Sequence, residues 1–156
     1  MPSFVAFIPT PTSHINGFFT LVDVSPSDVV YDLGCGDGRL LFAALEKGAG
    51  RAVGVELDPE PLVTARNWAK KKGVEDRTTF IEGDIMSANL SDATIVFTFL
   101  SSAAAMALKD KFDKELKPGT KVVMEMFPVP GWKPKRVVER GTDFYLYVMT
   151  PERLVA

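Results

Sequence analysis

The stretch Val29-Val30-Tyr31-Asp32-Leu33-Gly34-Cys35-Gly36-Asp37-Gly38 decides the fold of this chain. Its first five residues are mostly apolar, which is typical of a buried strand. Three glycines follow at alternate positions, and the segment 38–47 then predicts a helix that stops at Gly48. A glycine-rich turn between a strand and a helix places a ligand at the helix N-terminus. The stretch therefore predicts an α/β fold with a binding loop at residues 34–38.

Strand and helix patterns alternate along the rest of the chain. The predicted strands are 29–33, 51–56, 78–82, 93–99 and 120–127, and the predicted helices are 38–47, 59–72 and 101–116. This alternation is typical of a parallel sheet with helices on both faces. Residues 128–134, which lead to the next predicted strand at 135–139, are too few for a crossover helix. We therefore expect 135–139 and 143–150 to form an antiparallel pair that completes a Rossmann-like sheet of seven strands.

The composition bounds the class of protein. With 156 residues, the chain fits one domain spanning 1–156. Its net charge of −2 and its sequence pI of about 5.4 lack the basic excess of a nucleic-acid binder, so no nucleic-acid partner is expected. The sequence has no cluster of histidines and cysteines, so it does not predict a metal site. No apolar run approaches the roughly 20 residues that cross a bilayer, and the N-terminus lacks a secretory pattern, so we expect a cytoplasmic monomer.

The N-terminal segment is predicted to be extended and then helical. Three prolines among the first eleven residues favour an irregular lead-in. Thr12 or Ser13 can cap a helix that runs to about Val22, although Gly17 weakens this prediction. His14 is the single histidine, and we expect it at the surface or at the helix cap rather than as a catalytic base.

The residues of the binding loop distinguish between two classes of cofactor, dinucleotides and S-adenosylmethionine. A dinucleotide site requires Gly-x-Gly-x-x-Gly or Ala, but Arg39 occupies the third small-residue position. Asp32 would repel a pyrophosphate, whereas it can accept a charge-assisted hydrogen bond from the amino group of S-adenosylmethionine. Gly34 and Gly36 let the backbone approach such a ligand closely, and Cys35 is interpreted as a small residue filling the tight turn.

Acidic residues also lie at the ends of the next two predicted strands. Glu56 ends the second strand, where a carboxylate can accept from ribose hydroxyls. Asp84 follows the third strand and is placed to bond the adenine amino group, while Leu57 and Ile85 can pack against the ring. Together with Asp32 and the glycine loop, these residues predict an S-adenosylmethionine site that releases S-adenosylhomocysteine as the product.

At these residues the chain resembles the seven-β-strand methyltransferases. Further stretches resemble a subfamily that contains an archaeal protein-lysine methyltransferase and the mitochondrial lysine methyltransferases of ATP synthase subunit c and the adenine nucleotide translocase. These stretches are 4–11, 30–39, Phe97-Thr98-Phe99-Leu100, 114–120 and Gly131-Trp132. The chain departs from the subfamily at Ala6 and Phe7, where the subfamily has proline and tyrosine.

The resemblance implies a second part of the site. It implies that Pro9 and Thr10 lie over the cofactor, and that the segment from Thr98 through Phe99 to Ser101 lines the methyl-transfer site. Phe4, Phe7, Phe99, Phe127 and Trp132 are candidate walls of an acceptor pocket. Glu125, near the end of the fifth predicted strand, is a candidate for attracting an incoming lysine or orienting its amine.

The acceptor predicted in this way is a protein substrate with accessible lysines. Methyltransferases of base amines and glutamine amides carry Asp/Asn-Pro-Pro-Tyr/Phe after the fourth strand, where this chain has Thr98-Phe99-Leu100-Ser101. A cytosine C5 methyltransferase needs a cysteine beyond the cofactor loop, and the chain has none. Two alternatives remain, a small-molecule methyltransferase and a non-catalytic cofactor-binding module.

Overall fold

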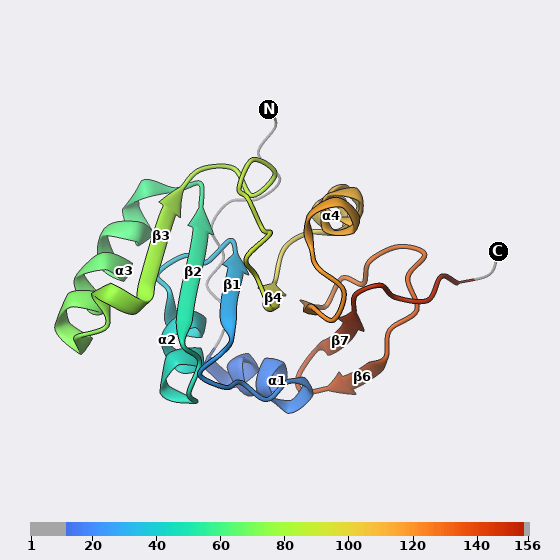
Figure 1. Ribbon diagram of the computed structural model, residues 1–156, viewed down its shortest axis with the longest axis horizontal. Helices are drawn as coiled ribbons and strands as arrows, with labels where there is room; N and C mark the ends of the chain where they lie inside the picture. Colours follow the sequence, from blue (N-terminus) through green and yellow to red (C-terminus); the bar gives the residue numbers. More distant parts are fainter. Residues whose placement is uncertain (1–11, 155–156) are drawn as a thin grey trace.

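The computed structural model describes residues 12–154. Along the chain they form α1 (Thr12–Leu21), β1 (Val29–Leu33), α2 (Arg39–Glu46), β2 (Arg51–Glu56), α3 (Pro59–Lys72), the short 3₁₀ helix η1 (Glu75–Arg77), β3 (Thr78–Glu82), β4 (Ile95–Thr98), α4 (Ser102–Glu115), β5 (Lys121–Glu125), β6 (Arg136–Glu139) and β7 (Asp143–Val148). Figure 1 shows the strands side by side in one sheet between the helices.

The sheet has seven strands in the order β3-β2-β1-β4-β5-β7-β6. The first five strands along the chain are parallel, while β7 inserts antiparallel between β5 and β6. β2 and β3 extend the sheet on one side of β1, and β4 and the later strands extend it on the other side. The direction in which strands are added therefore reverses between β1 and β4. The predicted mostly parallel sheet with an antiparallel C-terminal pair is confirmed.

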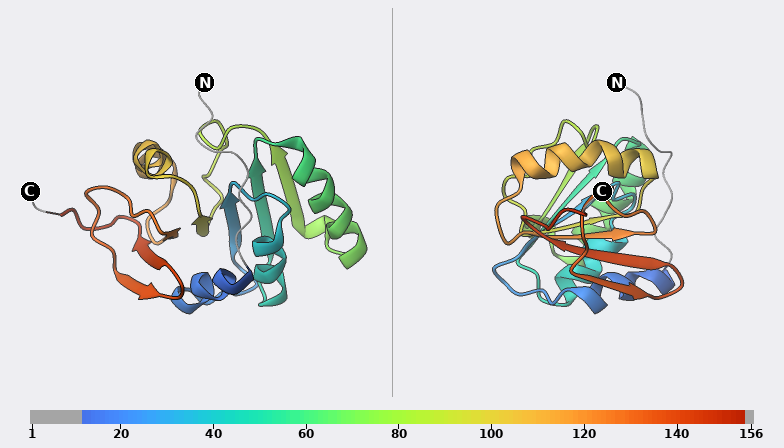
Figure 2. Two further views of the ribbon diagram at one scale, coloured as in Figure 1. Left: turned by 180° about the vertical axis from the view of Figure 1, so that it is seen from behind. Right: turned by 90° about the vertical axis from the view of Figure 1, so that its right-hand side faces the viewer.

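Helices cover both faces of the sheet, as predicted. α1, α2 and α3 supply apolar side chains to a core on one face, together with Phe97, Val123 and Phe144. α4 packs on the other face, in a second core that includes Trp132 and Tyr147. In the right-hand view of Figure 2, α4 lies above the sheet and α1 below it. Each face of the central strands is therefore buried, which explains their nearly continuous apolar sequence.

Three strands end earlier than the sequence predicts. The predicted ranges 93–99, 120–127 and 143–150 shorten to β4, β5 and β7. β5 stops because the backbone turns at Met126, whose φ is 71°. Beyond β7, the amide of Met149 still donates to the carbonyl of Thr120 at 2.9 Å. The other differences are the one or two residues by which element boundaries usually vary.

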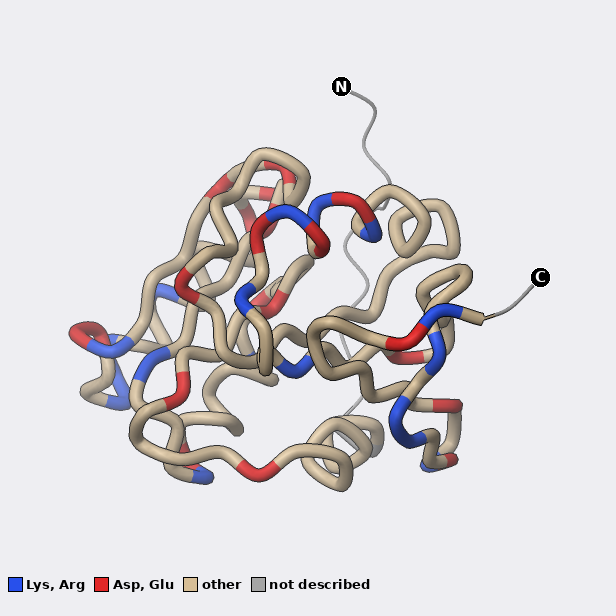
Figure 3. Tube along the Cα trace, turned by 45° about the vertical axis from the view of Figure 1, so that its right-hand side comes forward, with Lys and Arg blue, Asp and Glu red and all other residues tan. Residues whose placement is uncertain are grey.

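Neither the helices nor the distribution of charge in the described part of the chain points to a membrane or to a surface of one charge. Within residues 12–154, no helix is long and apolar enough to cross a membrane. Acidic and basic residues are interleaved in the view of Figure 3, including the C-terminal strands.

α1 depends on a glycine that appears unfavourable in the sequence. The helix forms through Gly17, and the ring of Phe144 on β7 fills the space that a Cβ atom at Gly17 would need. Phe144 also contacts Phe18 edge-on, with ring centroids 5.0 Å apart. The low helix propensity of Gly17 is thus offset by the close approach of α1 to the sheet.

The Gly17→Ala variant tests this packing. Alanine favours an isolated helix by up to about 1 kcal/mol, but the overlap with Phe144 should cost more, so we expect a net destabilisation of about 1–2 kcal/mol. Urea unfolding measures the change. Asn16→Ala, on the exposed side of the same helix, is the matched control and should unfold at the wild-type concentration or above. A Gly17→Ala protein at least as stable as wild type would contradict the packing argument.

Candidate functional site

The carboxyl ends of the parallel strands lie at one edge of the sheet. Among them, β1 and β4 are neighbours although the chain leaves β1 toward β2. Ligands of open α/β sheets bind outside the strand ends at such a reversal. The loop 34–38 follows β1 directly, so the structure places the predicted binding loop at this position.

Hydrogen bonds hold the loop against β2. The amides of Gly34 and Cys35 donate to the carbonyl of Val55 at 2.8 and 3.1 Å. The amide of Gly36 donates to Glu56 Oε1 at 2.9 Å, and the amide of Asp58 donates to Glu56 Oε2 at 3.0 Å. Glu56 therefore fixes the loop, a function that the sequence did not indicate. Each carboxylate oxygen keeps a second lone pair, which can accept from a ligand hydroxyl.

Close packing explains the small residues of the loop. Gly34 has a φ of 89°, and a Cβ atom there would lie 2.8 Å from Leu100 Cδ2. The thiol of Cys35 packs over Gly54 of β2. Burial raises the pKa of this thiol further above its ordinary value, with a smaller contribution from Asp32. Cys35 therefore acts as a small apolar filler, not as a nucleophile.

Three carboxylates, those of Asp32, Glu56 and Asp37, lie close together near the loop. Burial, with smaller contributions from the charges of Glu56 and Asp37, raises the pKa of Asp32 to about 8. Asp37 is itself paired with Arg39, whose Nη2 lies 2.7 Å from Asp37 Oδ2, and this hydrogen bond lowers the pKa of Asp37. A cationic ligand next to Asp32 would relieve the cost of ionising it. This is the environment that the ammonium and sulfonium groups of S-adenosylmethionine require.

The residues predicted to bind adenine lie one strand further out. The amide of Gly83 donates to the carbonyl of Glu56 at 2.9 Å, which fixes the end of β3 beside β2. Asp84 Oδ1 accepts from the amide of Met86 at 2.8 Å. Ile85 is buried, whereas Leu57 is 47% exposed. An exposed leucine beside this acidic edge offers an apolar surface that a flat ring can cover, so the residues fit the predicted cofactor.

At the end of β4, the predicted polar side chains have structural partners. Thr98 Oγ1 donates to the carbonyl of Leu33 at 3.3 Å and thereby ties β4 to β1. Ser101 Oγ accepts from the amide of Ala104 at 3.1 Å and caps α4. Phe99 is partly buried and packs against the core on the α1 face. The structure thus brings this segment to the same edge as the loop, but it engages both hydroxyls in the fold.

Glu125 lies away from the carboxylates of the loop. Its strand, β5, is separated from β1 by β4, and the side chain is fully buried. His14 Nδ1 lies 2.8 Å from Glu125 Oε2, and Thr142 Oγ1 donates to the same oxygen at 3.0 Å. A buried carboxylate held in this way is not presented to solvent, where it would attract an incoming lysine. His14 lies against Glu125 instead of serving as a surface residue or a helix cap.

Some predicted site residues lie outside the described residues, namely Phe4, Phe7, Pro9 and Thr10. Leu100 lies within the segment 98–101 that was predicted to line the methyl-transfer site, whereas no particular role was predicted for Asp37 or Met126. Asp37 had a signal, because it lies within the loop. The position of Met126 depends on the pairing of β5 with β7, which no local pattern in the sequence indicates.

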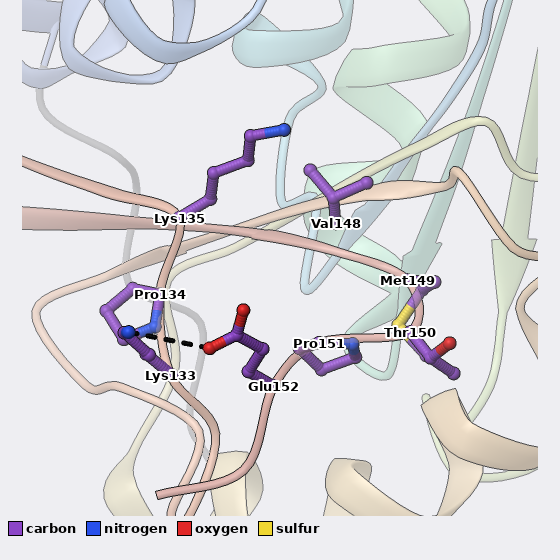
Figure 4. A pocket seen from close by; sticks show the side chains of 8 residues that line it. All are labelled: Lys133, Pro134, Lys135, Val148, Met149, Thr150, Pro151 and Glu152. Atoms are coloured by element: carbon purple, nitrogen blue, oxygen red, sulfur yellow. Dashed lines mark ion pairs between the residues drawn. The ribbon is translucent and has the colours of Figure 1, made fainter.

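A separate cavity of about 460 Å³ is lined by residues that precede β6 and residues that end or follow β7. Figure 4 shows its lining side chains, with Lys133 paired to Glu152. Val148 borders it and is paired with Lys121, the first residue of β5. The cavity therefore lies toward the edge where the parallel strands begin, away from the binding loop.

The fold and the acidic glycine loop together define an S-adenosylmethionine-dependent methyltransferase. A family model described as the ANTKMT methyltransferase domain matches residues 32–136. The chain belongs to this family of methyltransferases.

Similar proteins extend the match to nearly the whole chain. A protein-lysine N-methyltransferase of Saccharolobus islandicus is 41% identical over 151 residues, covering 93% of this chain and 94% of the relative. The adenine nucleotide translocase lysine N-methyltransferase of Mus musculus is 34% identical over 139 residues, which cover 89% of this chain and 60% of that protein. A crystal structure described as an RNA methyltransferase from Salinibacter ruber, in complex with S-adenosyl-L-homocysteine, is 37% identical with a TM-score of 0.87, covering 95% of this chain and 97% of that one.

The Asp32→Asn variant separates stability from cofactor binding. Between the ordinary carboxyl pKa of 3.8 and the value of about 8 in the ligand-free protein, the folded state binds a proton that the unfolded state has lost. The stability of the wild type should therefore fall as the pH rises through this range and become level above it. Asp32→Asn should remove this dependence and unfold about 3 °C or more above the wild type at pH 7.

The same variant should bind the cofactor about tenfold more weakly or worse, because a charge-assisted hydrogen bond is lost. Calorimetry in buffers of different ionisation heat should show that the wild type releases a proton on binding at pH 7 and that Asp32→Asn does not. Glu82→Gln, at an exposed carboxylate on β3, is the control. Equal cofactor affinity of Asp32→Asn and wild type would refute the role of Asp32.

Proposed function

We propose that this methyltransferase transfers methyl groups to lysine ε-amines of protein substrates. The observation that carries the proposal is the similarity to the Saccharolobus islandicus protein-lysine N-methyltransferase, which covers 94% of that relative. The match therefore leaves little of the relative outside the aligned region. The mammalian relative is longer, and the chain spans 60% of it, so its additional length is not needed for the fold described above.

The chemistry of a lysine acceptor fits the edge of the sheet beyond the loop. The bound cofactor supplies a methyl group on a sulfonium centre, and the amine that attacks it must be neutral. Partly buried Phe99, Leu100 and Phe127 follow β4 and β5 at this edge. An apolar, weakly hydrated surface lowers the pKa of a lysine amine and favours its neutral form. Positioning and exclusion of water are then the main contributions of the protein.

RNA is the second candidate acceptor, because the Salinibacter ruber structure is described as an RNA methyltransferase. Two observations favour protein over RNA. The net charge of the chain is −2, and acidic residues are interleaved with the basic ones on the C-terminal strands. An RNA-binding surface usually gathers basic side chains on one face.

A labelling experiment distinguishes the acceptors. The purified protein is incubated with isotope-labelled S-adenosylmethionine and, in separate reactions, with a protein extract, total RNA and a mixture of metabolite amines. We expect label on lysines of the protein extract, identified by mass spectrometry as mono-, di- or trimethyllysine. The reaction should be abolished or strongly reduced in the Asp32→Ala variant, which keeps the acceptor side intact.

Label in RNA or in metabolites with unlabelled protein would overturn the lysine proposal and replace it with the corresponding acceptor. Cofactor binding without turnover in all three reactions would instead indicate a binding module. Glu82→Gln controls for nonspecific effects of removing a carboxylate from this edge, and it should retain wild-type labelling.

A further inference from the structure

Three side chains from three elements meet below the end of β5. His14 comes from α1, Glu125 is the last residue of β5, and Thr142 lies in the turn between β6 and β7. His14 Nδ1 and Thr142 Oγ1 lie 2.8 and 3.0 Å from Glu125 Oε2. None of the three belongs to the carboxylate set of the cofactor loop. We call these residues the β5 clamp, because they join α1 and the β6–β7 turn to one strand end.

The clamp is tightly packed. The side chain of Glu125 is fully buried and that of His14 is 19% exposed. Gly141 leaves room for the imidazole, since a Cβ atom there would lie 2.9 Å from His14 Nε2. Within residues 12–154, Glu125 Oε1 has no hydrogen-bond partner. The contacts of His14 and Thr142 with Oε2 therefore locate the carboxylate of Glu125, while burial of Oε1 without a partner among the described residues is a cost to the fold.

The backbone directly after Glu125 is strained. The amide of Phe127 donates to the carbonyl of Glu125 at 2.8 Å, and Met126 between them has a φ of 71°. A three-residue turn with a positive central φ is the rare, strained form of the γ-turn. The amide of Met126 also donates to the carbonyl of Asp143 at 2.7 Å. Bonds to β7 and within the turn therefore hold Met126 in a conformation that a non-glycine residue seldom adopts.

This strain is not compensated by burial of the side chain. Met126 is 41% exposed, although it is an apolar residue. β5 is the parallel neighbour of β4, with Met124 opposite Thr98. Met126 therefore stands at the same edge as Phe99 and Leu100, which follow β4. Strained residues of this kind occur at binding and catalytic sites, where the surrounding structure fixes them.

We infer that Met126 contacts the acceptor and that the β5 clamp is the positioning group that holds it there. The inference rests on the proposed lysine acceptor and adds a residue that selects it. A lysine side chain brings four methylene groups to the site, and a flexible, polarisable methionine packs well against such a chain. The clamp acts only through Met126, because Glu125 itself is buried away from the acceptor.

Substitutions at Met126 distinguish this role from a purely structural one. Met126→Gly removes the side chain and also relieves the positive φ, so the variant should be at least as stable as wild type. Met126→Ala removes the side chain but keeps the strain. If Met126 contacts the acceptor, both variants should raise the KM for a lysine-containing protein about fivefold, with cofactor affinity unchanged. Val137→Ala, which trims an exposed apolar residue on β6, is the control and should keep the wild-type KM.

A double-mutant cycle tests the clamp. Glu125→Ala should raise the KM as Met126→Gly does, and the double variant should show little further change, because both act on the same contact. Glu125→Gln can still accept from Thr142 and should fall between wild type and Glu125→Ala. Should Glu125→Ala fail to fold, Glu125→Gln combined with Met126→Gly provides the same cycle.

The outcomes separate the two proposals. Wild-type turnover on lysine with an unchanged KM in Met126→Gly overturns this inference and leaves the proposed function standing. Loss of kcat in Glu125→Gln with intact cofactor binding would make Glu125 a catalytic group and overturn its positioning role. Absence of lysine turnover by the wild type overturns the proposed function, and this inference with it.

Discussion

Two carboxylates buried next to each other, Asp32 and Glu56, are the constraint around which the binding edge is organised. Glu56 is satisfied by the amides of Gly36 and Asp58, and these bonds fix the loop. Burial, and to a smaller extent the charges of Glu56 and Asp37, raise the pKa of Asp32 to about 8. A fold selected for stability alone would replace such a pair by apolar residues. A cation bound beside the pair would offset the cost of ionising Asp32, so the pair is understandable as part of a site for a cationic cofactor.

That Asp32, Glu56 and Asp84 lie at one edge of the sheet could be predicted from the sequence because the relevant signals are local. Asp32 and Glu56 lie at the end of a strand pattern, Asp84 comes just after one, and the ends of parallel strands must meet at one edge. The hydrogen bonds that side chains at this edge make within the fold depend instead on which strands pair with one another. The bond between Glu56 and the Gly36 amide requires β1 beside β2, and the bond from Thr98 to the Leu33 carbonyl requires β1 beside β4. No pattern within one segment contains that information.

The acceptor side was less accessible to sequence reasoning for a related reason. His14, Glu125 and Thr142 lie far apart in the chain, and each alone is an ordinary polar residue. A positive φ is usually signalled by glycine or asparagine, and at Met126 the sequence gives no such signal. Glu125 was therefore interpreted by its charge, as an attractor for lysine, whereas its burial gives it a positioning role. The cytoplasmic location, the monomeric state and the roles of Pro9 and Thr10 stay predictions from the sequence.

The contact between Gly17 and Phe144 has a consequence for the order in which the chain can fold during synthesis. α1 emerges from the ribosome early, but β7, against which it packs, is made near the other end of the described chain. The sheet from β1 to β5 can pair as it appears, with α2 and α3 closing over it. Phe18 and Phe19 can pack against Phe97 of β4 once the parallel sheet has formed, but the contact of Gly17 with Phe144 cannot form until β7 has inserted between β5 and β6. The first helix to be synthesised therefore completes its docking late, and the contact between His14 and Glu125 that it carries forms with the last strands of the sheet.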